Sequence, residues 1–248
     1  MTEKRGVTVM IFITGDLHGS HDIAKLASEH FTVQNELTRS DYLIICGDFG
    51  LRWCDSSDER FWLRWLERRS WTTLWIDGNH ENFDMLKQYP VEEWRGGKIQ
   101  RITEHIFHLC RGSVFDIDGK RIFAFGGAES HDREYRKLGE TVWNEELPEI
   151  SEIDYARKTL DSVGRTVDLI ITHTLPGKIQ EDLFSDNQYP CNRLTDFFDE
   201  IESYVDFRSW FSGHYHYSGW YDKKHILIYN DIVKLTDNGI ERVYCPKE

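Results

Sequence analysis

Short apolar runs rich in β-branched and aromatic residues recur along the chain, and a glycine-containing polar turn follows each of the first three. These runs are typical of buried strands, and they cover residues 7–13, 42–46 and 72–76. Each turn leads into a stretch with apolar residues at helical spacing. The predicted helices span 20–30, with Ser20 as a candidate N-cap, 58–69 and the shorter 81–88. A repeated strand–turn–helix unit indicates parallel strands joined by crossover helices.

The second half of the chain has a different order of predicted elements. Short strands come first, with Asp118-Gly119 as a hairpin turn between the last two: 98–102, 106–111, 113–117 and 120–125. A polar, acidic and partly helical region over 128–163 follows. Strands then return, with one more helix near 192–204, at 167–173, 207–216, 225–230 and 240–244. We therefore expect a single α/β domain over residues 1–248, a four-layer α-β-β-α sandwich of two mixed sheets flanked by helices, with the polar turns at strand carboxyl ends.

Charge and cysteine content narrow the classes of partner. A net charge of −13 argues against a broad basic surface, so nucleic acid is a disfavoured substrate. The five cysteines are odd in number and lack CxxC spacing, which indicates neither a disulfide framework nor a thiolate zinc site. The N-terminal apolar run is too short to span a membrane and precedes no small-residue cleavage site. We expect a cytoplasmic protein with no membrane partner.

Five polar segments at the ends of predicted strands hold the candidate chemistry. They are GDLHG (15–19), GDFG (47–50), GNHE (78–81), TH (172–173) and GHYH (213–216). Their candidate metal ligands are Asp16, His18, Asp48, Asn79, His173, His214 and His216, with His80 beside them. Carboxylate, amide and imidazole donors without a thiolate suit Mn²⁺, Fe²⁺ or Zn²⁺ better than a structural zinc. The pattern predicts a catalytic metal centre.

A two-metal hydrolytic centre needs a ligand that bridges both ions. Asp48, in the middle of the first three motifs, is a good candidate because a carboxylate offers two oxygens. His214 and His216 are two residues apart, which in an extended strand places both side chains on one side. Both imidazoles could then reach one bimetal cluster, though not necessarily the same ion.

In this order the five motifs resemble the pattern of the calcineurin-like metallophosphoesterase superfamily: D-x-H, G-D, G-N-H-[DE], H and G-H-x-H. One such motif alone is a weak signal, but five in order across residues 15–216 are specific. The resemblance implies two divalent ions, Mn²⁺ in first place with Fe, Zn or Ni as alternatives. It assigns one ion to Asp16, His18, Asp48 and His216, and the other to Asp48, Asn79, His173 and His214.

The resemblance also implies catalytic roles. His80 would face the substrate without binding metal and would stabilise the transition state or protonate the leaving oxygen, while a metal-bound hydroxide attacks phosphorus in line. The branch of Ser/Thr protein phosphatases and dinucleoside tetraphosphatases is matched only in part. Arg52 stands four residues after Asp48, the spacing of that branch's arginine. Two positions depart from the pattern of that branch: Leu51 stands where the branch has an acid, and Asp77 stands where it has an arginine.

The predicted function is hydrolysis of a phosphate mono- or diester, with a small or terminal ester preferred over duplex nucleic acid. Candidate substrate contacts are Arg52 and, in a glycine-led loop over 126–136, His131, Arg133 and Arg136. A solvated charged loop is an equally open interpretation of 126–136. Two alternative functions are a nuclease acting on single strands or terminal phosphodiesters and a metal-binding scaffold without turnover.

Other side chains are assigned to the scaffold. Surface or satisfied core positions are expected for His21, His30, His105, His108 and His225. A solvated face with helix-start charge, or a guard against polyanions, is expected of Glu140, Glu145, Glu146, Glu149 and Glu152. A core beside the first sheet is expected to contain Trp53, Trp62, Trp65, Trp71 and Trp75.

Overall fold

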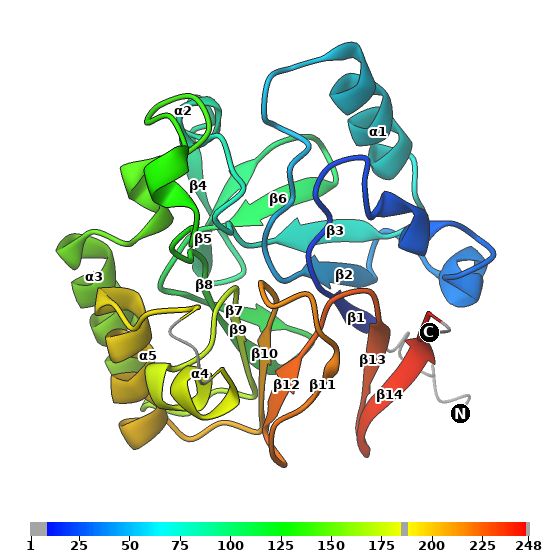
Figure 1. Cartoon of the computed structure of the whole chain (residues 1–248). Helices are drawn as coiled ribbons and strands as arrows, with labels where there is room; N and C mark the ends of the chain where they lie inside the picture. The colour runs from blue at the N-terminus through cyan, green and yellow to red at the C-terminus, as the bar shows by residue number, and fades with distance from the viewer. Residues whose placement is uncertain (1–8, 185–187, 247–248) are drawn as a thin grey trace, which may run out of the picture.

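Two β-sheets face each other in the computed structural model, which describes residues 9–184 and 188–246 (Figure 1). Within those residues the larger sheet has eight strands, in the order β14 (Gly239–Tyr244), β13 (Ile232–Thr236), β1 (Ile11–Thr14), β2 (Tyr42–Ile45), β3 (Thr72–Trp75), β6 (Ile106–Leu109), β5 (Gly97–Arg101) and β4 (Val91–Trp94). The smaller sheet, over the same described ranges, has six, in the order β11 (Gly219–Trp220), β12 (His225–Leu227), β10 (Ser209–Ser212), β9 (Leu169–Thr172), β8 (Lys120–Phe125) and β7 (Ser113–Ile117).

Both sheets are mixed, with parallel strands at their centres. β1, β2, β3 and β6 run parallel, and so do β8, β9, β10 and β12. The last residues of neighbouring parallel strands lie opposite each other, as Thr14 and Ile45 do in the larger sheet and Thr172 and Ser212 in the smaller one. The chain therefore leaves these strands at the same level, which sets the position of the loops that follow.

An apolar layer fills the space between the sheets. Its members include Ile13, Ile44 and Leu74 from the larger sheet and Ile171 and Phe211 from the smaller one. The central strands are buried on both faces, which is why they read as continuous apolar runs in the sequence.

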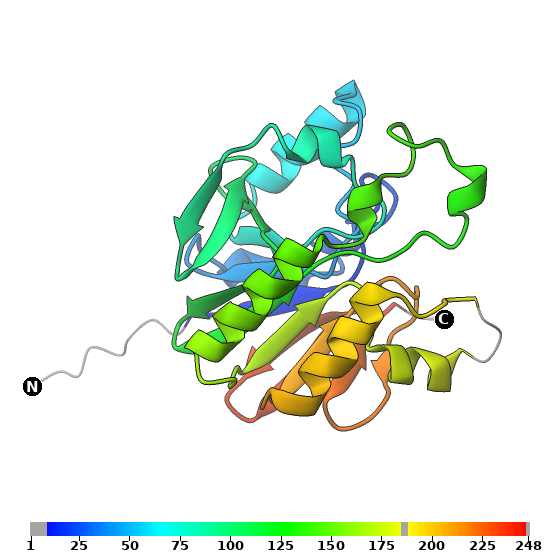
Figure 2. The same ribbon diagram turned by 90° about the vertical axis from the view of Figure 1, so that its left-hand side faces the viewer.

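Helices cover the outer faces of both sheets (Figure 2). Over the larger sheet, α1 (Ser57–Glu67) and α2 (Phe83–Leu86) pack on a cluster that contains the buried Trp71 and Trp75. Over the smaller sheet, α3 (Ile150–Ser162) and α5 (Arg193–Tyr204) contribute apolar faces, and α4 (Gly177–Leu183) follows β9. The predicted α-β-β-α class is confirmed, and so is the core position of Trp71 and Trp75, while the other three tryptophans of the prediction are only partly buried against this cluster.

The predicted helix over 20–30 is wrong. This segment contains a short 3₁₀-helix, Ile23–Leu26, and a second one follows at Thr32–Glu36, while Ser20 caps neither. Helical spacing would place Lys25 on a solvated face. Instead its ammonium group is buried and donates to carbonyl oxygens in the loops after β1 and before β13. This tertiary contact overrides the local helical pattern.

Among the strands and α-helices of the described residues, β4, β11, β13 and α4 had no sequence prediction. β4 is an edge strand with exposed side chains, so it lacks the alternation that marks a half-buried strand. The predicted helix over 81–88 shrinks to the single turn of α2, which Asn82 caps by accepting from the Met85 N–H at 3.0 Å. No helix within the described ranges is long and apolar enough to cross a membrane.

Candidate metal centre

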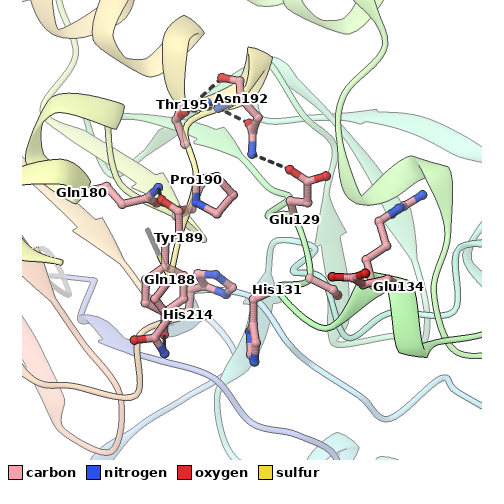
Figure 3. Close-up of a pocket in the computed structure, with 13 residues that line it drawn as sticks. Glu129, His131, Glu134, Gln180, Gln188, Tyr189, Pro190, Asn192, Thr195 and His214 are labelled. Atoms are coloured by element: carbon pink, nitrogen blue, oxygen red, sulfur yellow. Dashed lines mark hydrogen bonds between the residues drawn. The ribbon is translucent and has the colours of Figure 1, made fainter. Parts of the chain in front are cut away.

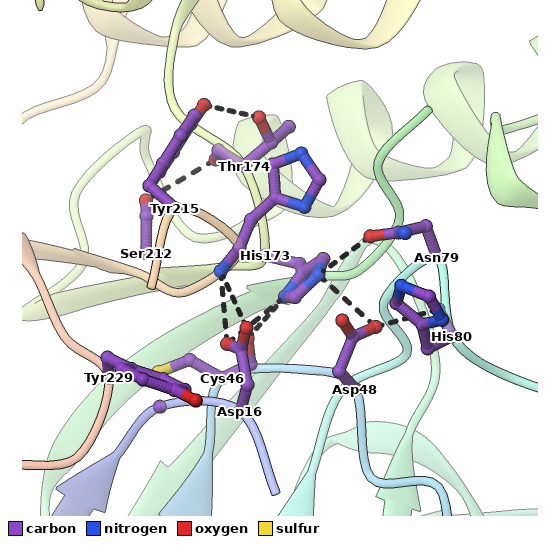
Figure 4. Close-up of polar contacts among 12 residues, drawn as sticks. Asp16, Cys46, Asp48, Asn79, His80, His173, Thr174, Ser212, Tyr215 and Tyr229 are labelled. Carbon is purple, nitrogen blue, oxygen red and sulfur yellow. Dashed lines mark hydrogen bonds and ion pairs between the residues drawn. The ribbon is translucent and has the colours of Figure 1, made fainter. Parts of the chain in front are cut away.

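Five loops meet at one edge of the two sheets. Asp16 follows β1, Asp48 follows β2 and Asn79 follows β3, while His173 follows β9 and His214 follows β10. Because the carboxyl ends of parallel strands share an edge, motifs that are far apart in the sequence converge there. Figure 4 shows the side chains of Asp16, Asp48, Asn79 and His173 pointing toward a common centre.

Two buried carboxylates occupy the middle of this centre. Asp16 and Asp48 are 0% and 1% exposed. In the described part of the chain no lysine or arginine forms an ion pair with either carboxylate, and all their ion-pair partners are histidines. Buried carboxylates without a permanent cation are unfavourable, so this donor set fits bound metal ions. Donor atoms lie within 4.8 Å of one another in the groups Asp16–His18–His216, His18–Asp48–His80 and Asp16–Asp48–His173.

His18 and His173 each turn one ring nitrogen toward the centre. His173 Nδ1 donates to the carbonyl oxygen of Cys46 at 2.7 Å, which directs Nε2 toward the centre, 3.3 Å from Asp48 Oδ1. His18 Nδ1 contacts Asp22 Oδ2 at 2.7 Å, and its Nε2 lies 3.2 Å from Asp48 Oδ2. Burial opposes protonation, but the facing carboxylates outweigh it and raise the pKa to about 10 for His18 and about 9 for His173. Metal binding would therefore release protons from these rings.

Asn79 presents its amide oxygen to the centre. Its Nδ2 donates to Ser130 Oγ at 3.1 Å, so Oδ1 faces inward, 3.2 Å from His173 Nε2. The Ser130 N–H in turn donates to Glu146 Oε2 at 3.0 Å. An oxygen is the donor that a divalent ion needs from an amide, so Ser130 fixes the correct orientation. Sequence reasoning gave Ser130 no role, although it lies within the loop over 126–136.

Ser130→Ala is expected to weaken metal binding about tenfold to a hundredfold, because the Asn79 amide loses the partner that orients it. Calorimetric titration of metal-stripped protein with Mn²⁺ measures this affinity. Ser203→Ala on the exposed side of α5 is the matched control and should bind as the parent does. Equal affinities in all three proteins would show that Asn79 needs no such partner.

The two late histidines diverge from their sequence prediction. β10 ends at Ser212, and His214 and His216 follow in left-handed conformations with φ of 71° and 50°, so they are not alternate positions of an extended strand. His216 Nε2 lies 3.3 Å from Asp16 Oδ2. The His214 ring lies beside His173, with centroids 5.0 Å apart, outside the three donor groups. Burial lowers the pKa of His214 to about 3, which keeps the ring neutral.

His80 lies at the rim of the centre, against an arginine. The backbone N–H of His80 donates to Asp48 Oδ1 at 2.7 Å, and the His80 ring lies among the donor atoms of His18 and Asp48. The Arg136 guanidinium faces both ring nitrogens at 3.3 Å and pairs through Nε with Asp132 at 2.7 Å. Burial, with further opposition from Arg136, lowers the pKa of His80 despite the nearby Asp48.

The other predicted substrate contacts lie elsewhere. Arg52 donates to Asp55 at 2.9 Å and has no contact with the donor groups. Arg133 donates to the Trp143 carbonyl oxygen at 2.9 Å and to Glu146 at 3.2 Å. His131 is exposed and lines a cavity beside His214. Of the four residues predicted to contact substrate, the structure brings Arg136 to the centre.

The acidic cluster is only partly solvated. Glu146 is fully buried and accepts from the Ser130 N–H and from Arg133, so its predicted solvated position is wrong. Glu149 and Glu152 form the capping box of α3, which confirms their predicted helix-start role. Burial raises the pKa of the Glu146 carboxyl group.

Two further residues without an assigned role hold the loops in place. Glu81 is buried and accepts from a backbone N–H of the loop after β2 at 2.7 Å. Lys25 donates to the carbonyl oxygen of Asp16. Gly47 has the expected turn role: its φ is 100°, and a Cβ there would lie 2.1 Å from His173 Nδ1. Glu81 could have been singled out by its place in GNHE, whereas nothing local marks Lys25.

A buried ionic network lies beneath the third motif. Asp77 accepts from Arg111 Nε at 2.9 Å and lies 3.1 Å from His108 Nε2, and its carbonyl oxygen accepts from the Gly127 N–H at 2.8 Å. Arg111 also donates to the Glu145 carbonyl oxygen at 2.6 Å. Against the effect of burial, Arg111 and His108 hold the pKa of Asp77 well below its usual range. The network ties the GNHE loop to the segment that carries Ser130, and it confirms His108 as a satisfied core histidine.

Arg111→Met is expected to lower the free energy of unfolding by about 3–5 kcal/mol, because it leaves the Asp77 carboxylate buried without its cation. Urea denaturation followed by circular dichroism measures the change. Arg157→Met is the control, since its pair with Glu200 is 42% and 39% exposed and should contribute about 1 kcal/mol or less. A similar decrease in the free energy of unfolding in both variants would mean that the buried ion pair stabilises the protein no more than the surface pair does.

Comparison with known proteins places this arrangement in a family. The family model for calcineurin-like phosphoesterases matches residues 9–218, a range that contains all five motifs. No functionally curated protein matches the chain significantly.

Solved structures resemble the chain at low sequence identity. A structure described as a 5′-nucleotidase from Staphylococcus aureus superposes with a TM-score of 0.52 at 13% identity, over 96% of this chain and 55% of that one. The chain thus spans about half the length of that protein. Phosphopantetheinyl hydrolase from Mycobacterium tuberculosis gives a TM-score of 0.47 at 16% identity, over 98% of this chain and 100% of that one. At such identities the likeness concerns the fold and nothing finer.

Proposed function

Since the chain belongs to the calcineurin-like phosphoesterase family, we propose that it hydrolyses phosphate mono- or diesters with the help of two divalent metal ions. The observation that supports this most directly is the pair of buried carboxylates, Asp16 and Asp48, whose ion-pair partners in the described residues are all histidines. A metal-binding scaffold would need the same donors, so turnover is what distinguishes the two functions. The proposed unit of function is one domain over residues 1–248.

The proposed ligand sets follow the family pattern. Asp16, His18, Asp48 and His216 would hold one ion, and Asp48, Asn79, His173 and His214 the other. When bound, the two ions would polarise the phosphoryl oxygens and make water a stronger nucleophile. The mixture of carboxylate, amide and imidazole donors favours Mn²⁺, with Fe, Zn and Ni as the next choices.

His80 and Arg136 are the two side chains that we expect to contact the reacting phosphate. His80 lies at the rim of the centre, where its ring can donate a hydrogen bond to the phosphoryl or leaving oxygen. Arg136 adds a permanent positive charge beside it, which stabilises the extra negative charge of the transition state. Asp132 holds this guanidinium through its Nε, and both terminal nitrogens face the His80 ring, one of them also donating to the Thr141 carbonyl oxygen.

Arg136→Ala is expected to raise KM for a simple phosphate ester about tenfold, the scale of one hydrogen bond to a charged group. Arg52→Ala is the comparison variant, because the Arg52 side chain donates to Asp55 and should change KM by less than about twofold. Steady-state kinetics on both variants test the assignment. If only Arg52→Ala raised KM, Arg52 and not Arg136 would be the residue that contacts the phosphate.

Turnover tests the proposed function itself. Metal-stripped protein is reconstituted separately with Mn²⁺, Zn²⁺, Ni²⁺ and Mg²⁺ and assayed with an aryl phosphate and a bis-aryl phosphate. We expect hydrolysis of at least one ester with at least one metal, and none in the stripped protein. Absence of turnover with all four metals, in protein shown to have bound them, would contradict the proposal and favour the scaffold alternative.

The proposed substrate is a small or terminal ester. The net charge of −13 opposes the binding of a polyanion, so long duplex nucleic acid is not favoured.

All five cysteines are free thiols, which supports the proposed location in a reducing compartment such as the cytoplasm.

A further inference from the structure

A cavity of about 590 Å³ opens beside the metal centre on the His214 side (Figure 3). Two of its lining residues contact residues of the centre. His214 lines the cavity, and its backbone N–H donates to Asp16 at 3.0 Å. Ser130 also lines it and accepts from Asn79. A space of this size can hold a polar organic group attached to a phosphate at the metals.

The walls of the cavity are held by hydrogen bonds that do not involve a ligand. Gln180 is buried and accepts from the Tyr215 hydroxyl at 2.7 Å, and its amide nitrogen donates to the carbonyl oxygen of Tyr189. This contact helps to hold the Tyr189 ring against His214, with centroids 5.3 Å apart. The cavity is therefore preformed, with an aromatic ring next to the metal-binding residues.

Acidic groups dominate the charge of the cavity. Glu129 and Glu134 line it opposite Tyr189 and Gln180, as Figure 3 shows. Glu129 accepts one hydrogen bond, from Asn192 Nδ2 at 3.2 Å, and within the described residues its second oxygen has no hydrogen-bond donor. The single arginine among the described lining residues is Arg133, which is paired with the buried Glu146.

The remaining lining groups are mostly uncharged and polar. They comprise hydroxyl and amide side chains, among them Thr174, Gln188 and Asn192. Such groups, together with a carboxylate that has an unused acceptor, suit a ligand rich in hydroxyl or amine donors. A second phosphate or a carboxylate on the ligand would meet the like charges of Glu129 and Glu134, while the one arginine among the described lining residues is already paired with Glu146.

We infer that this cavity is the leaving-group subsite, and that it selects phosphate esters of uncharged or cationic polar alcohols over esters that carry a second anionic group. The inference rests on the proposed function. In the reaction, water adds to phosphorus, the bond between phosphorus and the alcohol oxygen breaks, and that oxygen takes up a proton. The products are the free alcohol, released into the cavity, and inorganic phosphate.

The kinetic test compares two small esters that differ in charge, β-glycerophosphate and phosphoglycolate, on the metal-loaded protein. In the Glu129→Gln, Glu134→Gln double variant we expect the ratio of their kcat/KM values to fall at least about fivefold, because two repelling charges are gone. Comparing variant with parent cancels the intrinsic difference in reactivity between the esters. Glu140→Gln is the matched control, since Glu140 lies in the same region, pairs with Lys137 and does not line the cavity. It should keep the parent ratio.

A binding test without chemistry uses two phosphonates, aminoethylphosphonate and phosphonopropionate, which lack the ester bond. Calorimetry should show tighter binding of the cationic compound to the parent, by about tenfold, and a smaller difference in the double variant. If the esters are hydrolysed but the double variant keeps the parent's ratio of kcat/KM values, the inference is overturned and the proposed function stands. Equal affinities of the parent for the two phosphonates have the same consequence. Failure to hydrolyse any ester overturns the proposed function, and the inference falls with it.

Discussion

Replacing Asp48 by asparagine is expected to remove both metal ions together and to lower kcat by at least about a thousandfold. Asp48 contributes to two of the three donor groups, and its oxygens contact His18 on one side and His173 on the other. An amide has nearly the same shape but no charge, so it cannot bridge two cations as a carboxylate does. Loss of the metals removes several kcal/mol of transition-state stabilisation, which corresponds to the expected decrease in rate.

Elemental analysis of the purified variant, together with its kcat, tests this expectation. Glu104→Gln is the control: Glu104 is an exposed side chain in a group of ligand-type residues before β6, at the opposite end of the strands. It should retain two ions and parent activity. Loss of a single ion from Asp48→Asn, with the other retained at full affinity, would show that Asp48 serves one site only.

His80→Ala is expected to lower kcat by about a hundredfold or more while the protein keeps two metal ions. The His80 ring lies at the rim of the centre and contacts Arg136, which suits a group that acts on the phosphate. Burial lowers the pKa of His80, so the ring is neutral at pH 7 and carries one N–H that can donate to an oxygen.

The decisive comparison for His80 is between kinetics and metal content. A fall in activity with metal content near two places His80 in chemistry, whereas a parallel loss of metal would make it a ligand, as its position near His18 and Asp48 also permits. His105→Ala, at a partly exposed position outside the centre, should change neither quantity and controls for histidine replacement as such.

The strand ends and their motifs were predictable from local patterns. Apolar runs such as residues 42–46 are buried on both faces, and parallel pairing then brings the loops after them to one edge. The orientation of the ligands was not predictable in this way. Asn79 depends on Ser130, which lies 51 residues further along the chain, and no spacing rule connects them.

The wrong sequence predictions also arise from contacts between segments that are distant in the sequence. Glu146 belongs to an acidic stretch that reads as solvated, yet it is buried because the Ser130 N–H and Arg133 supply donors from another segment. Lys25 interrupts an expected helix because its ammonium group satisfies carbonyl oxygens around the first motif. In both cases a tertiary hydrogen bond outweighs local propensity.

Anomalous diffraction from crystals of the Mn²⁺-reconstituted protein tests the dinuclear centre most directly. We predict two peaks about 3.5–4 Å apart. Asp48 should lie between them, with His18 and Asp16 beside one and Asn79 and His173 beside the other. A single peak, or two peaks that avoid Asp48, would contradict the proposed two-metal phosphoesterase.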